Sequence, residues 1–337
     1  MKTLMNKFMI FFCKSVFSRV LLVSIVCVFM YSCSNETVTP TGSSENYPVI
    51  FYTSDGGNTW DFDTIISNSF LSAGFEQFVI VSPNVYTVSY TNNIYYSNDD
   101  FHTWIPSIPV NSPVFRKFCS KSGNGFAIAA DGTESYIYGS SNGTDWSVSY
   151  DINLNNQSFN DIDMNLNKII AIDKYGATYS LNGGNSWQSV VIPGASFLTS
   201  VSFIEQNKAC ALDMNGKVYF TSDNGASWSS RSDIGSDSYR IIFKDNSLGF
   251  VTSNTKLYRT ADEAMTWTLI STTAAPLYSI QFAGSNIYAI SGGKLLRSAD
   301  NGVTWNQVSL PLNTANLSQI YFQDDGLYGY ITGRLRQ

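Results

Sequence analysis

Carboxylates in short turns are the residues of this chain with the clearest potential for chemistry. Asp131, Asp173 and Asp213 each end a predicted strand at the same kind of turn, and Glu134 lies in the first of these turns. Two carboxylates about 5 Å or about 6.5–9.5 Å apart can hydrolyse a glycosidic bond. Asp is also favoured in turns because its oxygens accept backbone N–H groups. The three aspartates are therefore candidates both for catalysis and for turn capping.

Arginines in the predicted connectors offer a second kind of site. Arg116, Arg231 and Arg240 lie in segments that should reach the same end of the domain as the aspartate turns. A guanidinium donates several hydrogen bonds in a fixed fork and suits carboxylate groups. Together with Glu134, these arginines are the candidates for ligand binding.

A repeated sequence motif must fix the strands that place these turns. All seven tryptophans close a motif of the form Ser/Thr-x-Asp-x-Gly-x-Ser/Thr-Trp, here called the box. Successive tryptophans are 44, 42, 41, 41, 39 and 38 residues apart. A period near 40 residues in a chain with strand patterns is typical of propeller blades. The box pairs are Asp55 and Trp60, Asp99 and Trp104, Asn142 and Trp146, Asn182 and Trp187, Asp223 and Trp228, Asp262 and Trp267, and Asp300 and Trp305.

The composition of the box predicts a hairpin corner. Asp or Asn can accept hydrogen bonds from the backbone N–H groups ahead of it, and Gly allows a positive φ. The indole then folds under the turn and buries on the order of 200 Å². Two boxes depart from the pattern at Gly, with Phe101 and Ala264 there, and two have Asn142 or Asn182 for the Asp, the former in a box that is one residue shorter. A corner is needed in every blade and a catalytic group is not, so we interpret the box as structural.

The phrase resembles the Asp-box, or bacterial neuraminidase repeat, of sialidases, sortilin-type receptors, xyloglucanases and photosystem II assembly-factor-like propellers. The resemblance covers the chain from about Pro48 onward. It implies that the boxes lie on the face opposite the substrate pocket. Sialidases carry an arginine in a Phe/Tyr-Arg-Ile-Pro phrase before the first box, whereas Val49–Tyr52 here has none. The resemblance therefore favours the fold and disfavours sialidase activity.

The residues that zinc-dependent or serine-hydrolase catalysis would need are missing from the sequence. His102 is the only histidine and lies inside a box, which excludes a histidine-based zinc cluster and a Ser-His-Asp triad. Every tryptophan belongs to a box, so none is left as a sugar-stacking platform. Asp99-Asp100 and Asp324-Asp325 could offer oxygens to calcium, but paired acids in turns are more often solvated. The sequence predicts no cofactor and no metal site.

The repeats predict an all-β chain with a single seven-bladed β-propeller over residues 48–337 and one box per blade. The first box lacks two inner strands, and the C-terminal end supplies two, Leu317–Gln323 and Leu327–Thr332, without a box. Sharing one sheet between the two ends would close the ring and remove exposed edges. Residues 333–337 resemble a further strand that would compete with Val49–Tyr52.

The first 32 residues predict a signal peptide of the bacterial lipoprotein type. Four basic residues are followed by the apolar run Val20–Met30 and then by Ser32-Cys33. Lipidation at Cys33, a polar tether over residues 33–47 and an outer-membrane location in a Gram-negative envelope follow from this resemblance. An uncleaved anchor and ordinary secretion are the alternatives. Cys119 and Cys210 are expected to be buried and two blades apart, too far to form a disulfide.

Charge and motifs together favour a binding protein. After the signal, 16 basic residues face 26 acidic ones, which disfavours nucleic acid and anionic lipid as partners. The first hypothesis is a lipid-anchored, monomeric, non-enzymatic binding or assembly scaffold that holds a protein or glycan through the face opposite the boxes. The alternative is a surface glycoside hydrolase or glycan-binding protein. Paired carboxylates under about 10 Å apart beside exposed Tyr or Phe would favour the alternative.

Overall fold

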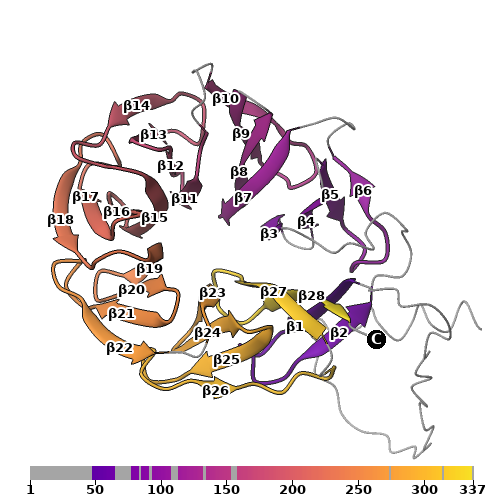
Figure 1. Ribbon diagram of the computed structural model, residues 1–337. Helices are drawn as coiled ribbons and strands as arrows, with labels where there is room; N and C mark the ends of the chain where they lie inside the picture. Colours follow the sequence, from indigo (N-terminus) through magenta and orange to yellow (C-terminus); the bar gives the residue numbers. More distant parts are fainter. Residues whose placement is uncertain are drawn as a thin grey trace, which may run out of the picture. The chain divides into compact units, whose positions relative to one another are not determined.

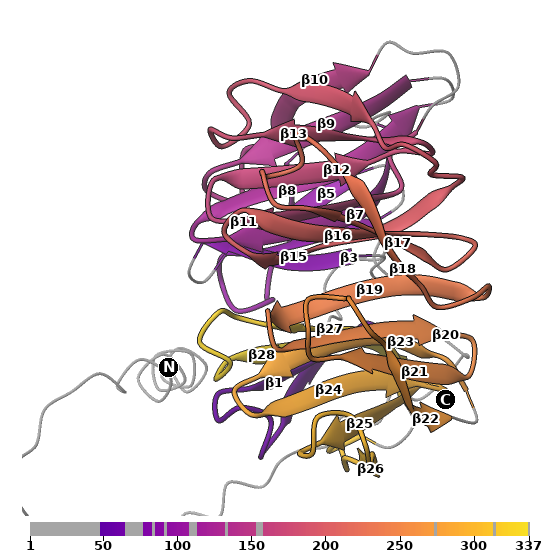
Figure 2. The same ribbon diagram turned by 90° about the vertical axis from the view of Figure 1, so that its left-hand side faces the viewer.

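The computed structural model describes residues 48–64, 77–82, 85–90, 93–107, 113–131, 134–152, 158–272, 275–312 and 315–335. The predicted signal peptide, Cys33 and the tether lie outside the described residues. Within them, seven four-stranded antiparallel sheets stand around a central axis as blades (Figure 1). The predicted seven-bladed β-propeller is confirmed. Figure 2 shows the same ring from the side, with the sheets stacked around it.

Each blade runs from an innermost strand at the axis to an outermost strand at the rim. The innermost strands are β3 (Gln77–Ser82), β7 (Val114–Lys121), β11 (Asp161–Asn165), β15 (Leu198–Glu205), β19 (Ser238–Asp245), β23 (Leu277–Ala283) and β27 (Ala315–Phe322). The second strands are β4 (Val85–Tyr90), β8 (Asn124–Asp131), β12 (Lys168–Ile172), β16 (Lys208–Asp213), β20 (Leu248–Ser253), β24 (Asn286–Ser291) and β28 (Gly329–Leu335).

The third and fourth strands flank the box in every blade. The third strands are β5 (Asn93–Ser97), β9 (Glu134–Ser140), β13 (Gly176–Ser180), β17 (Lys217–Thr221), β21 (Lys256–Thr260), β25 (Lys294–Ser298) and β1 (Pro48–Thr53). The outermost strands are β6 (Ile105–Pro106), β10 (Ser147–Ile152), β14 (Gln188–Val191), β18 (Ser229–Asp233), β22 (Thr268–Thr272), β26 (Asn306–Gln307) and β2 (Asp61–Thr64). Blades 1 to 6 are numbered from β3–β6 to β23–β26, and blade 7 is the sheet β27-β28-β1-β2.

Blade 7 joins the two ends of the described chain. β28 pairs with β1 in a register that runs from Pro48 opposite Arg334 to Thr53 opposite Gly329. The predicted sharing of one sheet is therefore confirmed. Residues 333–335 do not form a separate strand, because Gly333 pairs with Val49 on one side and Leu317 on the other and so continues β28.

The core consists of apolar clusters between neighbouring blades. One cluster joins Ile170 and Tyr179 of blade 3 to Val201, Ala211 and Tyr219 of blade 4. Because neighbouring blades cover both faces of a sheet, the second strand becomes buried throughout, as β16 does from Ala209 to Leu212. Cys119 is half-buried and Cys210 buried, and both are free thiols.

The box forms a hydrogen-bonded corner. In the first box the Asp55 carboxylate accepts from the Thr53 hydroxyl at 2.7 Å and from the Thr59 hydroxyl at 2.6 Å. The Trp60 indole N–H donates back to the carbonyl of Gly57 at 3.1 Å. Gly57 has a φ of +84°, which glycine adopts without steric cost.

The two faces of the ring are now distinct. The boxes and the turns between first and second strands form one face, here the box face. The turns between second and third strands, and the connectors between blades, form the other, here the loop face. Every antiparallel blade repeats this alternation, so residues at the start of a third strand lie on the loop face.

Candidate functional site

Two of the three predicted catalytic aspartates cap their own turns on the loop face. Asp173 Oδ1 accepts the backbone N–H groups of Tyr175 at 2.7 Å and Gly176 at 2.8 Å. Asp213 Oδ1 accepts those of Asn215 at 3.0 Å and Lys217 at 2.9 Å. These are the bonds by which Asp stabilises turns.

Asp213 is fixed more firmly than Asp173. Its side chain is buried, and its Oδ2 accepts the hydroxyls of Ser196 at 3.2 Å and Tyr219 at 3.3 Å. Burial, followed by the charge of Asp213, raises the pKa of Tyr219 to about 12. Four hydrogen bonds thus engage both oxygens of this carboxylate.

Asp131 does not occupy the same position as the other two. Lys117 of β7 lies opposite Ile128, after a bulge that β15 of blade 4 also has between Leu198 and Ser200. In blade 4 the matching residue Ser200 lies opposite Leu212, directly before Asp213. β8 therefore continues two residues beyond the level of Asp213, and Asp131 is exposed at its end. The prediction that all three aspartates end their strands at the same kind of turn is therefore wrong for Asp131.

Glu134 lies next to Asp131 in the strand register and pairs with a tyrosine. The Tyr136 hydroxyl donates a short hydrogen bond to Glu134 Oε2. That bond, more than burial, raises the pKa of Tyr136 to about 12. The Tyr136 ring meets that of Tyr138 edge to face at 6.2 Å. Blade 2 thus carries acidic and aromatic side chains side by side on its third strand.

The three predicted arginines lie apart. Arg116 is exposed near the start of β7 and its Nη1 is 3.5 Å from Ser158 Oγ. Arg240 occupies the corresponding part of β19, where its Nη1 donates to the carbonyl of Tyr278 at 3.1 Å. Arg240 lines the central channel, whereas Arg116 is not among its lining residues.

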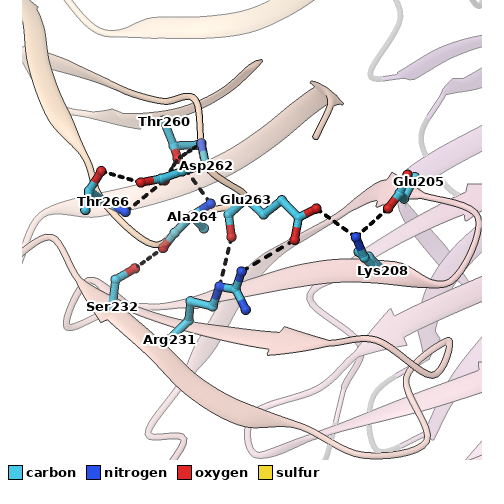
Figure 3. A network of polar contacts seen from close by, with 9 residues as sticks. All are labelled: Glu205, Lys208, Arg231, Ser232, Thr260, Asp262, Glu263, Ala264 and Thr266. Carbon is cyan, nitrogen blue, oxygen red and sulfur yellow. Dashed lines mark hydrogen bonds and ion pairs between the residues drawn. The ribbon is translucent and has the colours of Figure 1, made fainter. Parts of the chain in front are cut away.

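Arg231 lies on the outermost strand β18 and contacts the box of the next blade (Figure 3). Its Nε donates to the carbonyl of Glu263 at 3.0 Å, and its Nη2 is 3.5 Å from Glu263 Oε2. The guanidinium also lies 3.8 Å from the centroid of the Phe220 ring. Lys208 Nζ bridges Glu263 at 2.7 Å and Glu205 at 2.6 Å. This network joins blades 4 and 5, and the expectation that Arg231 lies in a connector was wrong.

The central channel of the ring is a cavity with a volume of about 440 Å³. All seven innermost strands line it (Figure 1). One residue in each strand occupies the same register level, and these seven residues form what is here called the belt. The belt consists of Gln77, Lys117, Asp161, Ser200, Arg240, Ser279 and Gln319.

Belt residues hold neighbouring blades together by accepting main-chain N–H groups. Asp161 Oδ2 accepts the N–H of Val201 at 3.0 Å, and Gln319 Oε1 accepts that of Phe78 at 2.7 Å. Ser279 Oγ accepts a further N–H from blade 7 at 3.2 Å. Each bond satisfies a donor that faces the channel, which would otherwise be left unpaired.

Other belt residues donate. Arg240 bonds the carbonyl of Tyr278 in blade 6, and Ser200 Oγ donates to a carbonyl of blade 5 at 3.3 Å. Lys117 Nζ lies 3.7 Å from Asp161 Oδ1. Asp161 raises the pKa of Lys117, but Arg240 and burial together lower it more, so the net shift is downward. The belt was missed in the sequence because its seven residues share a position and not a side-chain type.

Asp163 also lines the channel, two residues after Asp161 in β11. Its Oδ2 accepts the N–H of Phe203 at 2.8 Å and its Oδ1 that of Met164 at 2.8 Å. Burial raises its pKa to about 6 against the effect of these bonds. The carboxylates of Asp161 and Asp163 are thus both engaged by main-chain donors. The described residues contain no group of three or more His, Cys, Asp or Glu side chains suited to a metal ion.

An exposed apolar patch lies on the loop face of blades 3 and 4. It consists of Tyr175, Val191, Phe197 and Met214, whose exposed fractions are 42, 72, 37 and 54%. Main-chain bonds tie their loops together, with Ile192 N donating to Tyr175 O at 2.9 Å and Met214 N to Phe197 O at 2.8 Å. Contiguous exposed apolar residues of this kind mark contact surfaces. This patch and the loop-face end of the channel form the candidate site.

Comparisons with known proteins agree with the fold. A family model described as the DUF6242 β-propeller domain matches residues 235–335. No curated protein matches the chain. No helix in the described residues is long and apolar enough to cross a membrane.

Solved structures of low identity share the propeller. A structure of YCF48 bound to D1 peptide has a TM-score of 0.60 at 16% identity, over 78% of this chain and 92% of that one. YCF48 from Cyanidioschyzon merolae has a TM-score of 0.59 at 16% identity, over 77% and 94%. An ancestral GH74 enzyme has a TM-score of 0.58 at 14% identity, over 77% of this chain and 43% of that one. At these identities the likeness shows the fold alone.

Proposed function

We propose that this chain is an exported, lipid-anchored propeller that binds a protein segment through its loop face without catalysing a reaction. Residues 1–32 act as the signal, Cys33 carries the lipid, and the polar residues up to 47 form the tether. The mature protein is a monomer on the outer membrane of a Gram-negative cell. The propeller serves there as a rigid scaffold for assembly.

The proposal rests on which side chains of the loop face are bonded and which are exposed. The carboxylates of Asp173 and Asp213 accept hydrogen bonds from the backbone N–H groups of their own turns. Phe197 and Met214 beside them remain exposed, although burying an apolar side chain of this size contributes about 1.5–3 kcal/mol. The part of the loop face over blades 3 and 4 presents apolar side chains while Asp173 and Asp213 stay bonded, and such a surface is suited to contact with a partner.

The comparisons support this reading by analogy. One solved propeller of the same fold is described as bound to a peptide. A rigid ring can present loops from several blades to one extended segment, and such loops commonly carry the function of a scaffold. The polar mouth of the channel, with Arg240 and the exposed Tyr278, would take the polar part of that segment.

A glycoside hydrolase or glycan-binding protein is the second candidate. Glu134 with Tyr136, next to the exposed Asp131, is the observation that favours it. Tyrosine rings can stack on sugars, and two carboxylates could act as acid and base. The same propeller fold in a GH74 enzyme is compatible with this candidate and does not select it.

Peptide display against the mature lipoprotein in detergent tests the proposal. Selected peptides should bind the parent and lose at least about tenfold affinity in Phe197→Glu and Met214→Glu, measured by fluorescence anisotropy. Met265→Glu is the matched control, because Met265 is 60% exposed on the box face. Equal loss in the control would contradict loop-face binding. Cleavage of a glycan panel that disappears in Asp131→Asn or Glu134→Gln would favour the hydrolase.

A further inference from the structure

The belt carries one more positive than negative charge. Its charged members are Lys117, Asp161 and Arg240, and its other four members are neutral Ser or Gln side chains. The two cations come from β7 in blade 2 and β19 in blade 5, and Asp161 comes from β11 in blade 3, between them (Figure 1). Since the chain after residue 32 has 16 basic residues against 26 acidic ones, a cationic site at its axis is a local exception.

Asp161 does not neutralise both cations, because its oxygens are already engaged. Oδ2 accepts the Ser200 hydroxyl at 2.8 Å and the Val201 N–H at 3.0 Å, and Oδ1 accepts the Ile162 N–H at 3.1 Å. Lys117 Nζ lies 3.7 Å from Oδ1, which is longer than a hydrogen bond. The ammonium of Lys117 therefore lies beside this carboxylate and still faces the channel.

Arg240 forms no ion pair with a carboxylate within the part of the chain that the structure describes. Its Nη1 donates to the carbonyl of Tyr278 at 3.1 Å, and a guanidinium has five N–H donors in all. Asp161 raises the pKa of Lys117, but the charge of Arg240, together with burial, lowers it more. The two cations thus repel each other within the channel, and an anion between them would relieve this repulsion.

The belt lies within reach of the apolar patch. Phe197 of the patch directly precedes β15, and Ser200, the belt residue of that strand, is three residues further on. Strands rise about 3.3 Å per residue, so the two levels are at most about 10 Å apart. The channel volume of about 440 Å³ is within the range of small-ligand sites. A protein segment that covers the patch can therefore extend a side chain or its own end into the channel.

We infer that the protein segment bound at the loop face places a carboxylate in the channel, between Lys117 and Arg240. This role of the channel rests on the proposed function, in which a segment covers the patch. The planar fork of a guanidinium matches the two oxygens of a carboxylate, and the Lys117 ammonium adds a second positive charge. A phosphate dianion fits less well, because Asp161 and Asp163 also line the channel and would repel its second charge. The site is thus suited to a single negative charge.

Amide forms of the peptide test the inference on the unaltered protein. Peptides selected by display against the mature lipoprotein in detergent are synthesised with every carboxylate intact, and again with each Asp, Glu or C-terminal carboxylate converted in turn to its amide. We expect one amide form to bind at least about tenfold more weakly in fluorescence anisotropy, because hydrogen bonds to charged groups are the stronger ones. Side-chain and C-terminal amides distinguish the two sources of the carboxylate. Amide forms that all bind as tightly as the parent peptide would overturn the inference.

Charge-removing variants test whether the carboxylate binds at the belt. Arg240→Gln and Lys117→Gln keep a hydrogen-bond donor and lose the charge, so each should bind the acid peptide at least about tenfold more weakly and the amide form about as the parent does. Lys244→Gln is the matched control, because Lys244 also lines the channel on β19 but lies four residues beyond Arg240, about 13 Å away. Its affinity for the acid peptide should stay within about twofold. An Arg240→Gln protein that still distinguishes acid from amide as the parent does would contradict the assignment.

The outcomes separate this role of the channel from the proposed function. Absence of any selected peptide, or binding that survives Phe197→Glu and Met214→Glu, removes the proposed function and the inference with it. Peptides that need the patch and bind equally in their acid and amide forms remove the inference alone. Melting temperatures check that each variant is folded, and the amide comparison decides the matter if one is not, since it uses the parent protein.

Discussion

The ring of Phe101 meets the ring of Tyr330 edge to face, with centroids 6.2 Å apart, across the junction between the first blade and the closing blade. Phe101 replaces the usual glycine of its box and keeps a positive φ of 70°. It is buried and also lies 4.2 Å from the ring of Tyr86. The side chain thus fills the interface between blade 1 and blade 7, the blade in which the two ends of the described chain share a sheet, at the cost of an unfavourable backbone conformation.

Phe101→Gly should therefore destabilise the ring although it restores the box pattern. Removing a buried phenylalanine costs about 3–5 kcal/mol, and relief of the positive φ returns about 1–2 kcal/mol. The free energy of unfolding should fall by about 2–3 kcal/mol in denaturant titrations. Ala264→Gly, at the same box position with a φ of 66°, should change it by less than about 1 kcal/mol. A Phe101→Gly protein as stable as the parent would refute the closing role.

Two boxes contain Asn where Asp is usual, and their hydrogen bonds differ. Asn142 Nδ2 donates to the carboxylate of Asp145 at 2.7 Å, whereas Asn182 Nδ2 donates to the Ser186 hydroxyl at 2.9 Å. Asn142→Asp would place two carboxylates together and should lower stability at pH 7 by about 1 kcal/mol. Asn182→Asp should be neutral or stabilising, because the Ser186 hydroxyl can reverse and donate. Melting temperatures at pH 7 distinguish the two, and equal effects would contradict this account.

The box aspartates should make stability depend on pH under acidic conditions. Hydrogen bonds from the Thr59 hydroxyl and N–H lower the pKa of Asp55 from 3.8 to about 2, and those from Thr304 lower that of Asp300 equally. A lowered folded-state pKa contributes stability that is present above about pH 4 and is lost as the pH falls toward 2. The melting temperature should fall over this window. The Asp55→Asn, Asp300→Asn double variant should show a shallower fall, and an unchanged slope would contradict the assignment.

Replacing Asp213 should lower the stability of the protein much more than replacing Asp131. Asp213→Ala removes the acceptor for two backbone N–H groups and two hydroxyls in a buried site, so the free energy of unfolding should fall by about 2–3 kcal/mol. Asp131→Ala removes an exposed carboxylate and should change stability by less than about 0.5 kcal/mol. Chemical denaturation measures both. A stable Asp213→Ala protein would show that the carboxylate serves something other than its turn.

The ring could be predicted from the sequence because the box corner forms only with particular residue types. Only a Ser or Thr, an Asp or Asn and a Trp at fixed spacing build the same corner, so the repeat is visible in residue types. A belt position, by contrast, can hold any side chain that forms a hydrogen bond to the next blade. Arg240, Ser279 and Gln319 all do so, and although belt residues recur every 39 to 44 positions, no motif results.

The candidate site was less predictable than the fold. Asp131 seemed equivalent to Asp173 and Asp213 because turn spacing alone does not reveal that β8 continues two residues beyond the level at which β16 ends. Arg231 seemed to lie in a connector because its strand β18 has the polar sequence SSRSD, and its ion pair with Glu263 crosses to another blade. Such contacts depend on how blades meet. No local pattern around these residues encodes them.

Photo-crosslinking in living cells tests the central claim most directly. A photoreactive amino acid replaces Met214 on the loop face or Met265 on the box face, two methionines with exposed fractions of 54 and 60%. The account predicts a discrete protein adduct from position 214 and none from position 265 after immunoblotting. An adduct from position 265 alone, or from both positions equally, would contradict binding through the loop face.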